Sequence, residues 1–324
     1  MPRNPQPPPL DGILVVDKPR GKTSHDVVEA VRRLTGFRQI GHLGTLDPLA
    51  TGVLVLALGR ATRLARFYTG RRKRYTCAVR FGFSTDTYDA DGEPLGPDTS
   101  PALDAEQLQA LAAQFVGRIQ QIPPAFSAKK VHGRPAHELA RKNKPVKLEP
   151  VDVEVFEFRL MGVEGSLARF VVECGAGTYI RSLAHDLGKL QGSGAHLAEI
   201  VRTAAGEFTL DQAVSLADLA EDAKAGRLAS RVIRLENLLA ELPRASVLPI
   251  VEKRVRHGAK FNVPLAQVHP GQVTAAQGAP AELDSGEWKP SRLRVFNQQG
   301  QLIAIAEAVV PRTYQPVVVL EASR

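Results

Sequence analysis

Consecutive β-strand patterns without a helix between them constrain the fold of this chain more than any other feature. Residues 151–160 alternate apolar and acidic side chains, and residues 166–174 follow as a second strand pattern. Residues 73–82 also alternate, with Tyr75 on the apolar face, and residues 12–17 resemble a short buried strand. Strands joined without a crossover helix pair antiparallel. The sequence therefore predicts an α+β protein with a mixed, largely antiparallel central sheet, not a doubly wound one.

Three helix patterns are expected to flank this sheet. Residues 23–36 begin with a capping box formed by Thr23 and Asp26 and continue with apolar residues on one face. Residues 104–116 form a second amphipathic pattern, and the third runs from position 179 to position 190. Helices and strands thus alternate in part and cluster in part, as in mixed-sheet proteins.

The chain is expected to contain three parts. Residues 1–10 are proline-rich and read as a flexible lead-in. Residues 11–245 hold the main sheet and its helices. After about Pro243 the chain changes to short strand-like pieces, and positions 293–307 predict a hairpin around a glycine-containing turn. We therefore predict a separate, small β-rich domain at residues 246–324.

Charge and cysteine content narrow the class of protein. The 324 residues carry a net charge of +8, and basic segments at 71–74, 129–130 and 140–147 favour a polyanionic partner. Cys77 and Cys174 form no C-x-x-C pair, and the histidines show no metal spacing, so we expect neither a disulfide nor a metal. The sequence shows no membrane span and no signal peptide. These features predict a cytoplasmic protein, most simply a monomer.

Two apparent motifs do not hold. The run P-R-G-K-T-S suggests a phosphate-binding loop, but position 16 is Val16 where that motif needs glycine. A glycine turn followed by a helix cap accounts for the run. Residues 85–94 suggest a calcium loop, but Thr87 would occupy the first ligand position and Asp98 the last, where a bidentate glutamate belongs. An exposed acidic turn is the better interpretation.

Residues 41–52, G-H-L-G-T-L-D-P-L-A-T-G, are the most informative segment for function. Asp47 followed by proline is typical of a helix N-cap, which is the structural interpretation. Gly41, Gly44 and Gly52, however, remove side chains on both sides of Asp47, as in loops that admit a flat ligand. The glycines therefore favour an accessible carboxylate that is free to act chemically.

At this point the chain resembles the TruB family of bacterial tRNA pseudouridine synthases, which isomerise uridine 55 of the T loop. The matching blocks lie in order over residues 11–210, and the most specific of them are G-T-L-D-P and G-T-Y-I-R. Further blocks are K-R-Y-T and F-S-T-D-T-Y-D-A-D-G. The resemblance implies the pseudouridine synthase fold with a PUA-like, RNA-binding C-terminal domain. It also implies the T arm of tRNA as partner and catalysis without a cofactor.

The resemblance also assigns the site. It implies that Asp47 is the catalytic nucleophile, that Tyr75 stacks on the target base, and that Arg181 pairs with the aspartate. The residue chemistry agrees, because a carboxylate can form and release a covalent bond and a guanidinium keeps it ionised and oriented. Substrate contacts are implied for four further residues, with the first of them filling the space of the flipped base: His42, Tyr179, Ile200 and Arg63.

Four positions depart from the family pattern. Arg63 replaces a lysine, Phe126 and His137 replace tyrosines, and Val201 replaces an arginine. A positive charge is kept at Arg63 and lost at Val201, so we expect these departures to affect RNA affinity and not chemistry.

Two other functions compete with catalysis on RNA. The first is a non-catalytic RNA-binding or RNA-folding module, which an altered Asp47 or Arg181 would have favoured, but both are intact. The second is a carboxylate-nucleophile hydrolase acting on a small molecule, which would turn over without tRNA. The complete set of site residues favours the isomerase.

Overall fold

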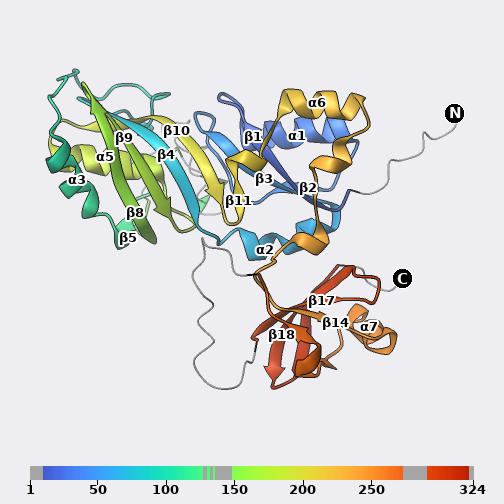
Figure 1. Cartoon of the computed structure of the whole chain (residues 1–324). Coiled ribbons are helices and arrows are strands. Elements are labelled where there is room, and N and C mark those ends of the chain that lie inside the picture. Colours follow the sequence, from blue (N-terminus) through green and yellow to red (C-terminus); the bar gives the residue numbers. More distant parts are fainter. Residues whose placement is uncertain (1–9, 127–129, 132–133, 136–147, 273–289, 321–324) are drawn as a thin grey trace.

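The computed structural model describes five segments of the chain (Figure 1). The proline-rich start, Lys129, His137 and the basic segment 140–147 lie outside the described segments, so their predicted roles stay predictions. The described segments are residues 10–126, 130–131, 134–135, 148–272 and 290–320.

An 11-stranded sheet forms the larger part of the structure and confirms the predicted α+β class. Most neighbouring strands pair antiparallel, as expected for strands that follow one another in sequence. In spatial order the main path is β12 (Val214–Ser215), β1 (Gly12–Lys18), β3 (Thr51–Leu58), β10 (Ala195–Ala205), β4 (Lys73–Phe81), β9 (Leu167–Cys174), β8 (Val151–Glu164) and β5 (Gly117–Gln121), and three short strands lie beside it, β2 (Ile40–His42), β11 (Phe208–Thr209) and β13 (Ile233–Arg234).

The pairing of β10 with β3 joins the two halves of this sheet. It is parallel, through Val201 with Thr51 and Arg202 with Gly52, whereas β10 pairs antiparallel with β4. Gly52 has a φ of +92°, and a Cβ there would lie 2.4 Å from the carbonyl oxygen of Arg202. Only glycine therefore allows the start of β3 to approach β10 this closely.

Helices α1 (Ser24–Thr35), α3 (Ala105–Ala113), α5 (Ile180–Gln191) and α6 (Leu216–Lys224) pack against one face of the sheet, and the first three of them match the predicted patterns. Helix α1 begins at Thr23, whose hydroxyl accepts the Asp26 N–H, and ends at Gly36 in the left-handed conformation. Among the described residues, no helix is long and apolar enough to cross a membrane. The other helices are α2 (Ala65–Tyr68) and α7 (Pro249–Arg256), with 3₁₀ turns at Gly59–Leu64, Leu210–Gln212, Leu228–Arg231, Leu235–Asn237 and Leu265–Gln267.

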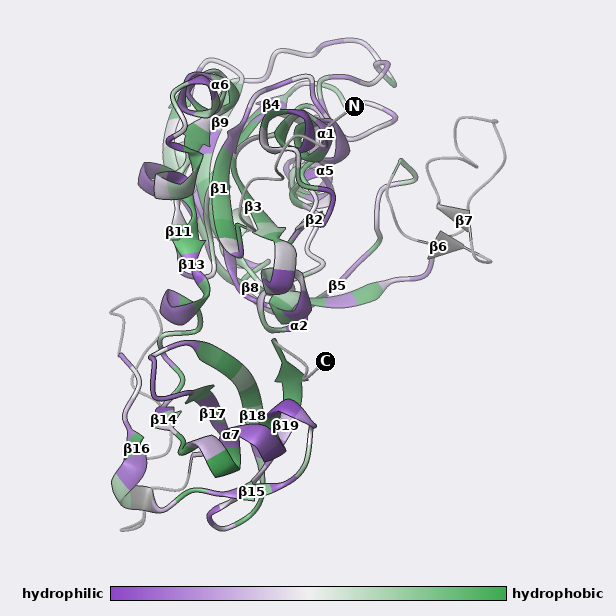
Figure 2. Ribbon diagram, turned by 90° about the vertical axis from the view of Figure 1, so that its right-hand side faces the viewer, coloured by the Kyte–Doolittle hydropathy of each residue, from purple (hydrophilic) through white to green (hydrophobic). Residues whose placement is uncertain are grey.

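Alternation along the strands divides the core into two apolar clusters. In β3, Leu54 and Leu56 pack toward the cluster that includes α1 and α5. Val53 and Val55 point to the opposite face, where the second cluster contains Leu64. The hydropathy colouring shows how apolar the central strands are (Figure 2). Because β3 is buried on both faces, it reads as a continuous apolar run, not as an alternating strand.

The C-terminal part forms its own β-sheet and lies below α2 in both views (Figures 1 and 2). The predicted hairpin is confirmed as an antiparallel strand pair. Arg63 donates a 2.6 Å hydrogen bond to the carbonyl of Val319 in this sheet. The strands in spatial order are β15 (Phe261–Asn262), β19 (Thr313–Val319), β18 (Leu302–Val310), β17 (Arg292–Phe296), β14 (Arg244–Ser246) and β16 (Val268–His269), and a separate two-stranded pair is β6 (Lys130–Val131) with β7 (Arg134–Pro135).

We predict that Gly52→Ala lowers the free energy of unfolding by about 2 kcal/mol or more, because the new Cβ would collide with main chain at a positive φ. Chemical denaturation followed by circular dichroism measures this change. Gly70→Ala is the matched control, since a Cβ at Gly70 has no atom within 4 Å. If the two variants were equally stable, the close contact between β3 and β10 would not require glycine at position 52.

Candidate active site

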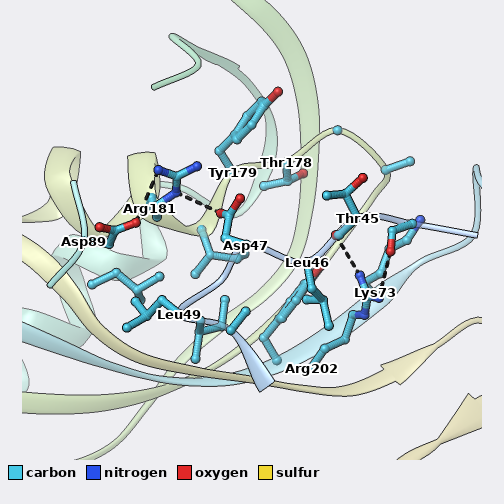
Figure 3. Close-up of a pocket in the computed structure, with 18 of the residues that line it drawn as sticks. Thr45, Leu46, Asp47, Leu49, Lys73, Asp89, Thr178, Tyr179, Arg181 and Arg202 are labelled. Carbon is cyan, nitrogen blue, oxygen red and sulfur yellow. Dashed lines mark hydrogen bonds and ion pairs between the residues drawn. The ribbon is translucent and has the colours of Figure 1, made fainter. Parts of the chain in front are cut away.

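Five of the seven predicted site residues line one cavity of about 270 Å³ (Figure 3). The walls come from the loop before β3, from β4 and β10, and from residues 175–181 at the start of α5. This volume is near the lower end of the range of about 300–1,000 Å³ typical of small-molecule sites. The cavity therefore suits one nucleoside-sized group. The predicted residues that line it are Asp47, Tyr75, Tyr179, Arg181 and Ile200.

Asp47 and Arg181 form the ion pair at the centre of this cavity. Nε of Arg181 lies 3.0 Å from Oδ2 of Asp47. The aspartate side chain is 45% exposed, whereas that of the arginine is only 6% exposed. The guanidinium is thus a fixed part of the wall, and it holds an oxygen of a carboxylate that a ligand can reach from the cavity.

The helix N-cap interpretation of Asp47 is wrong. The Ala50 N–H closes a turn by donating to the Asp47 carbonyl at 3.1 Å, and the chain enters β3 at Thr51. A helix cannot form here because Gly52 must already lie against β10. With no helix N–H groups to cap, the Asp47 side chain is free to face the cavity.

The main chain of this turn is held from several directions. All five carbonyls at positions 44–48 accept hydrogen bonds. The first two accept from Arg202 at 3.0 and 3.2 Å, the third from Ser24 at 3.1 Å, the fourth from the Ala50 N–H, and the fifth from Lys18 at 3.3 Å. The segment P-R-G-K-T-S, which we expected to be a simple turn before a helix cap, thus supports the loop that carries the candidate nucleophile. Sequence alone did not reveal this role, because the contacts join residues far apart in the chain.

A second carboxylate, Asp89, pairs with the same arginine and was missed by the sequence analysis. Its Oδ2 lies 3.3 Å from Nη1 of Arg181, and its Oδ1 accepts the Thr87 hydroxyl at 2.6 Å. The prediction of an exposed acidic turn is therefore wrong for Asp89, which is buried. The turn folds back against Leu197 of β10, and that packing delivers the carboxylate to Arg181.

Arg181 is further fixed by main-chain acceptors. Its Nη1 donates to the carbonyl of Thr87 at 3.1 Å and its Nη2 to the carbonyl of Phe126 at 3.0 Å. The departure from the family pattern at Phe126 therefore leaves this contact intact, because the main chain makes it. Held on several sides, Arg181 presents a single fixed orientation to Asp47.

Burial raises the pKa of Asp47 above the usual range of an aspartate, and the Arg181 guanidinium opposes that shift. The charge of Asp89 acts in the same direction as burial. The expectation that the arginine favours the ionised carboxylate agrees with the sign of its contribution, although burial is the larger effect. Burial also raises the pKa of the Tyr75 hydroxyl, which keeps that ring neutral.

Tyr75 and Ile200 come from neighbouring strands and line the apolar part of the cavity. Cys77 of β4 is directly opposite Ile200, and Tyr75 is opposite Arg202, so the two side chains are adjacent on the β4–β10 pair. Both are almost fully buried. A flat ring entering the cavity would meet an aromatic side chain and an aliphatic one.

Gln121 positions Tyr179 through its main chain. The Gln121 amide donates to the Tyr179 carbonyl at 3.0 Å and accepts the Tyr179 N–H at 2.8 Å. The glutamine is buried, and Tyr179 is the N-cap residue of α5 without a side-chain cap bond. A buried side-chain amide thus replaces the main-chain partner that Tyr179 would otherwise lack. The I-Q-Q-I-P-P segment before it carries no local signal of this role.

His42 and Arg63 lie outside the residues that line the cavity. Burial lowers the pKa of His42, and its Nδ1 has no hydrogen-bond partner within the described part of the chain. Arg63 instead bonds to the C-terminal sheet. Val201 takes part in the β10–β3 pairing. The substrate contacts expected of His42 and Arg63 therefore remain predictions.

The described residues contain no group of three histidine, cysteine or carboxylate side chains arranged to hold a metal ion. The polar groups of the cavity are instead a carboxylate pair shared by one guanidinium, two tyrosines and two further cations. Such a site can stabilise a transient bond to a carboxylate next to a stacked ring.

Comparison with known proteins agrees with this geometry. A model described as the N-terminal domain of TruB family pseudouridylate synthases matches residues 32–180, and a tRNA pseudouridylate synthase B C-terminal domain matches residues 181–246. The tRNA pseudouridine synthase B of Solibacter usitatus (strain Ellin6076) is 45% identical over 96% of this chain and 100% of its own length. That of Geobacter sulfurreducens (strain ATCC 51573 / DSM 12127 / PCA) is 37% identical over 89% of this chain and 100% of its own length.

Among solved structures, Cbf5 in the crystal structure of a Cbf5–Nop10–Gar1 complex has the same fold. The TM-score is 0.70 at 23% identity, covering 97% of this chain and 86% of that one. Fold and relatives together define a pseudouridine synthase. Within that class, the chain belongs to the TruB family, which confirms the resemblance drawn from its sequence blocks.

We predict that Gln121→Leu lowers turnover roughly 10- to 100-fold, because Tyr179 loses both of its main-chain bonds and shifts. It should also lower the free energy of unfolding by about 2 kcal/mol. Gln109→Leu is the matched control, since the Gln109 amide bonds to the main chain of β8 in the same two-way manner. The control should lose stability and keep turnover, and equal turnover in both variants would remove the positioning role.

We predict that kcat/KM rises with pH along a limb whose midpoint lies above the usual aspartate pKa of about 3.9. The sign follows because only ionised Asp47 can act as a nucleophile and its pKa is raised. Asp89→Asn should move the midpoint to lower pH by removing a negative charge that raises that pKa. Rates measured across the acid range, with circular dichroism to confirm folding, test this. An unchanged midpoint in the variant would count against coupling of the two carboxylates.

Proposed function

We propose that this enzyme converts uridine 55 in the T loop of tRNA to pseudouridine, with Asp47 as nucleophile and no cofactor. The observation that carries the proposal is the accessible Asp47 carboxylate held by buried Arg181, in one cavity with two tyrosines. The substrate class is supported by the curated relatives, which are named tRNA pseudouridine synthases. The net charge of +8 suits a polyanionic substrate.

The reaction is an isomerisation, in which one bond between uracil and ribose breaks and another forms. The bond from N1 of uracil to C1′ of the ribose breaks, the ring turns, and a bond from C5 to C1′ forms. C5 then loses its proton, while N1 gains one. In this scheme Asp47 carries a transient covalent bond and is released unchanged. Arg181 stabilises the carboxylate before attack and after release.

The ring must leave the stack of the folded T loop before it can reach Asp47. The cavity is lined by the turn of residues 44–50, and its size admits one base and not a paired stem. We infer that Tyr75 and Ile200 take the two faces of the flipped ring. His42, on the short strand β2 before the turn, would occupy the vacated place in the loop.

The neighbouring parts of the chain extend this proposal to the rest of the tRNA. Helix α7 of the C-terminal part carries exposed Lys253 and Arg254, and the main chain at Val319 already contacts Arg63 of the catalytic part. We infer that residues 246–324 act as an RNA-binding domain and that the enzyme works in the cytoplasm, where its tRNA substrate is made.

The decisive test is release of tritium from an unmodified tRNA transcript labelled at C5 of uracil. The wild type should release label, and Asp47→Asn should reduce the rate at least about a thousandfold because it removes the nucleophile. Asp152→Asn, on the exposed side of β8, is the control and should act like the wild type. Mapping the product by mass spectrometry of nuclease fragments places it at position 55 or elsewhere. Binding of the transcript without label release by the wild type would support the RNA-binding module instead.

A further inference from the structure

Two buried cations, Lys73 and Arg202, lie side by side on the cavity wall without a carboxylate partner. Lys73 is 8% exposed and Arg202 is 2% exposed. Their hydrogen-bond partners are neutral oxygens: Lys73 donates to the carbonyls of Thr69 and Arg71, and Arg202 donates to three other carbonyls and to the Tyr75 hydroxyl. Within the described part of the chain, neither forms an ion pair. Buried charges are normally paired, so an unpaired couple calls for an explanation.

The two cations also repel each other. Burial and, to a smaller extent, the charge of Arg202 lower the pKa of Lys73 to about 8. A structural lysine would gain from a nearby carboxylate, yet the residues directly opposite Lys73 on the two neighbouring strands are Cys174 and Ala205. Without a ligand, this arrangement disfavours the positive charge of Lys73. It therefore suits a site in which the ligand supplies the negative counter-charge.

Both cations face the cavity, and a glycine keeps the way to them open. A Cβ at Gly44 would lie 3.6 Å from Nη1 of Arg202 and 3.9 Å from Cε of Lys73. Any larger side chain at Gly44 would therefore cover both cations. Arg202 donates three N–H groups to carbonyls and a further one to the Tyr75 hydroxyl, and Lys73 donates two to carbonyls, so each retains at least one N–H group for another acceptor.

Charge is separated along the cavity. At one end Arg181 is shared by two carboxylates, those of Asp47 and Asp89, which leaves a net negative charge. At the other end lie the two unpaired cations, and of the two carboxylates Asp47 is the one that lies toward them (Figure 3). A ligand that matches this pattern has a neutral ring over Asp47 and an anionic group a short distance away. A nucleotide within an RNA chain has both.

We propose that Lys73 and Arg202 form a phosphate subsite that binds one backbone phosphate of the RNA next to the flipped nucleotide. The proposal rests on the proposed function, since it places the target ring over Asp47. The subsite would fix the ribose relative to the carboxylate, because a phosphate and a stacked ring together leave the nucleotide little rotational freedom. Phosphate contacts position a nucleic acid in this way without reading its sequence.

The test measures binding of T-arm RNA hairpins in which one phosphate at a time is replaced by an uncharged methylphosphonate. Full-length protein carrying Asp47→Asn is used throughout, so that the RNA is not altered during the measurement. One position of the neutral linkage should weaken binding roughly tenfold or more, because charge-assisted hydrogen bonds are lost there. Adding Lys73→Met should weaken binding of the unmodified hairpin by a similar factor. It should not weaken binding further when the hairpin already carries the neutral linkage at that one position.

Structural damage would give a different result, since it would weaken binding of every hairpin by the same factor. Lys73→Arg, which keeps the charge, should retain most of the affinity and the same sensitive linkage. Lys224→Met is the control for loss of one positive charge, because Lys224 is 73% exposed and lies on α6. Lys73→Met should also make the dependence of log affinity on log salt shallower by about 0.7–1.

A uniform effect of Lys73→Met across all hairpins, or no effect at all, would overturn the subsite. Failure of the proposed function looks different. In that case the wild-type enzyme would release no tritium from the labelled tRNA, whatever the hairpins show. Coupling between Lys73 and one linkage without tritium release would establish the subsite on a protein with another function.

Discussion

The close parallel contact of β3 with β10 is the constraint on which the rest of the structure depends. Gly52 lets the start of β3 lie against the main chain of Arg202. That contact places the turn carrying Asp47 beside Ile200 on β10 and Tyr75 on β4. The side chain of Arg202 then returns under the turn to bind its carbonyls. One backbone contact thus assembles three parts of the candidate active site.

Electrostatics within the cavity follow from shared partners. Arg181 serves two carboxylates, so neither is fully neutralised, and the exposed one keeps a raised pKa. Lys73 and Arg202, in contrast, have only neutral partners, which are main-chain carbonyls and the Tyr75 hydroxyl. The cavity thus contains one arginine that pairs with two carboxylates and two cations that pair with none. Such a cavity binds best a ligand that carries a negative charge. RNA meets that condition at every phosphate.

The main secondary structure was predictable because it depends on local patterns. The capping box at Thr23 and Asp26 and the alternation around Tyr75 each reflect one element and its burial. Asp47 was predictable as a candidate functional residue from its glycines and from the resemblance. Its helix-cap interpretation was wrong, since a proline after an aspartate indicates a turn or a helix equally, and the sheet contact at Gly52 chose the turn.

By itself, the sequence determined the fold class, the family blocks and the five predicted residues that line the cavity. Strand and helix periodicity and short motifs are local properties of the chain, so they can be recognised without knowing which residues are in contact. Only the tertiary structure decided that Asp89 is buried against Arg181, that Gln121 holds Tyr179, and that two cations lie unpaired beside Gly44. Each of these joins residues from separate elements, and no spacing along the chain encodes such a meeting.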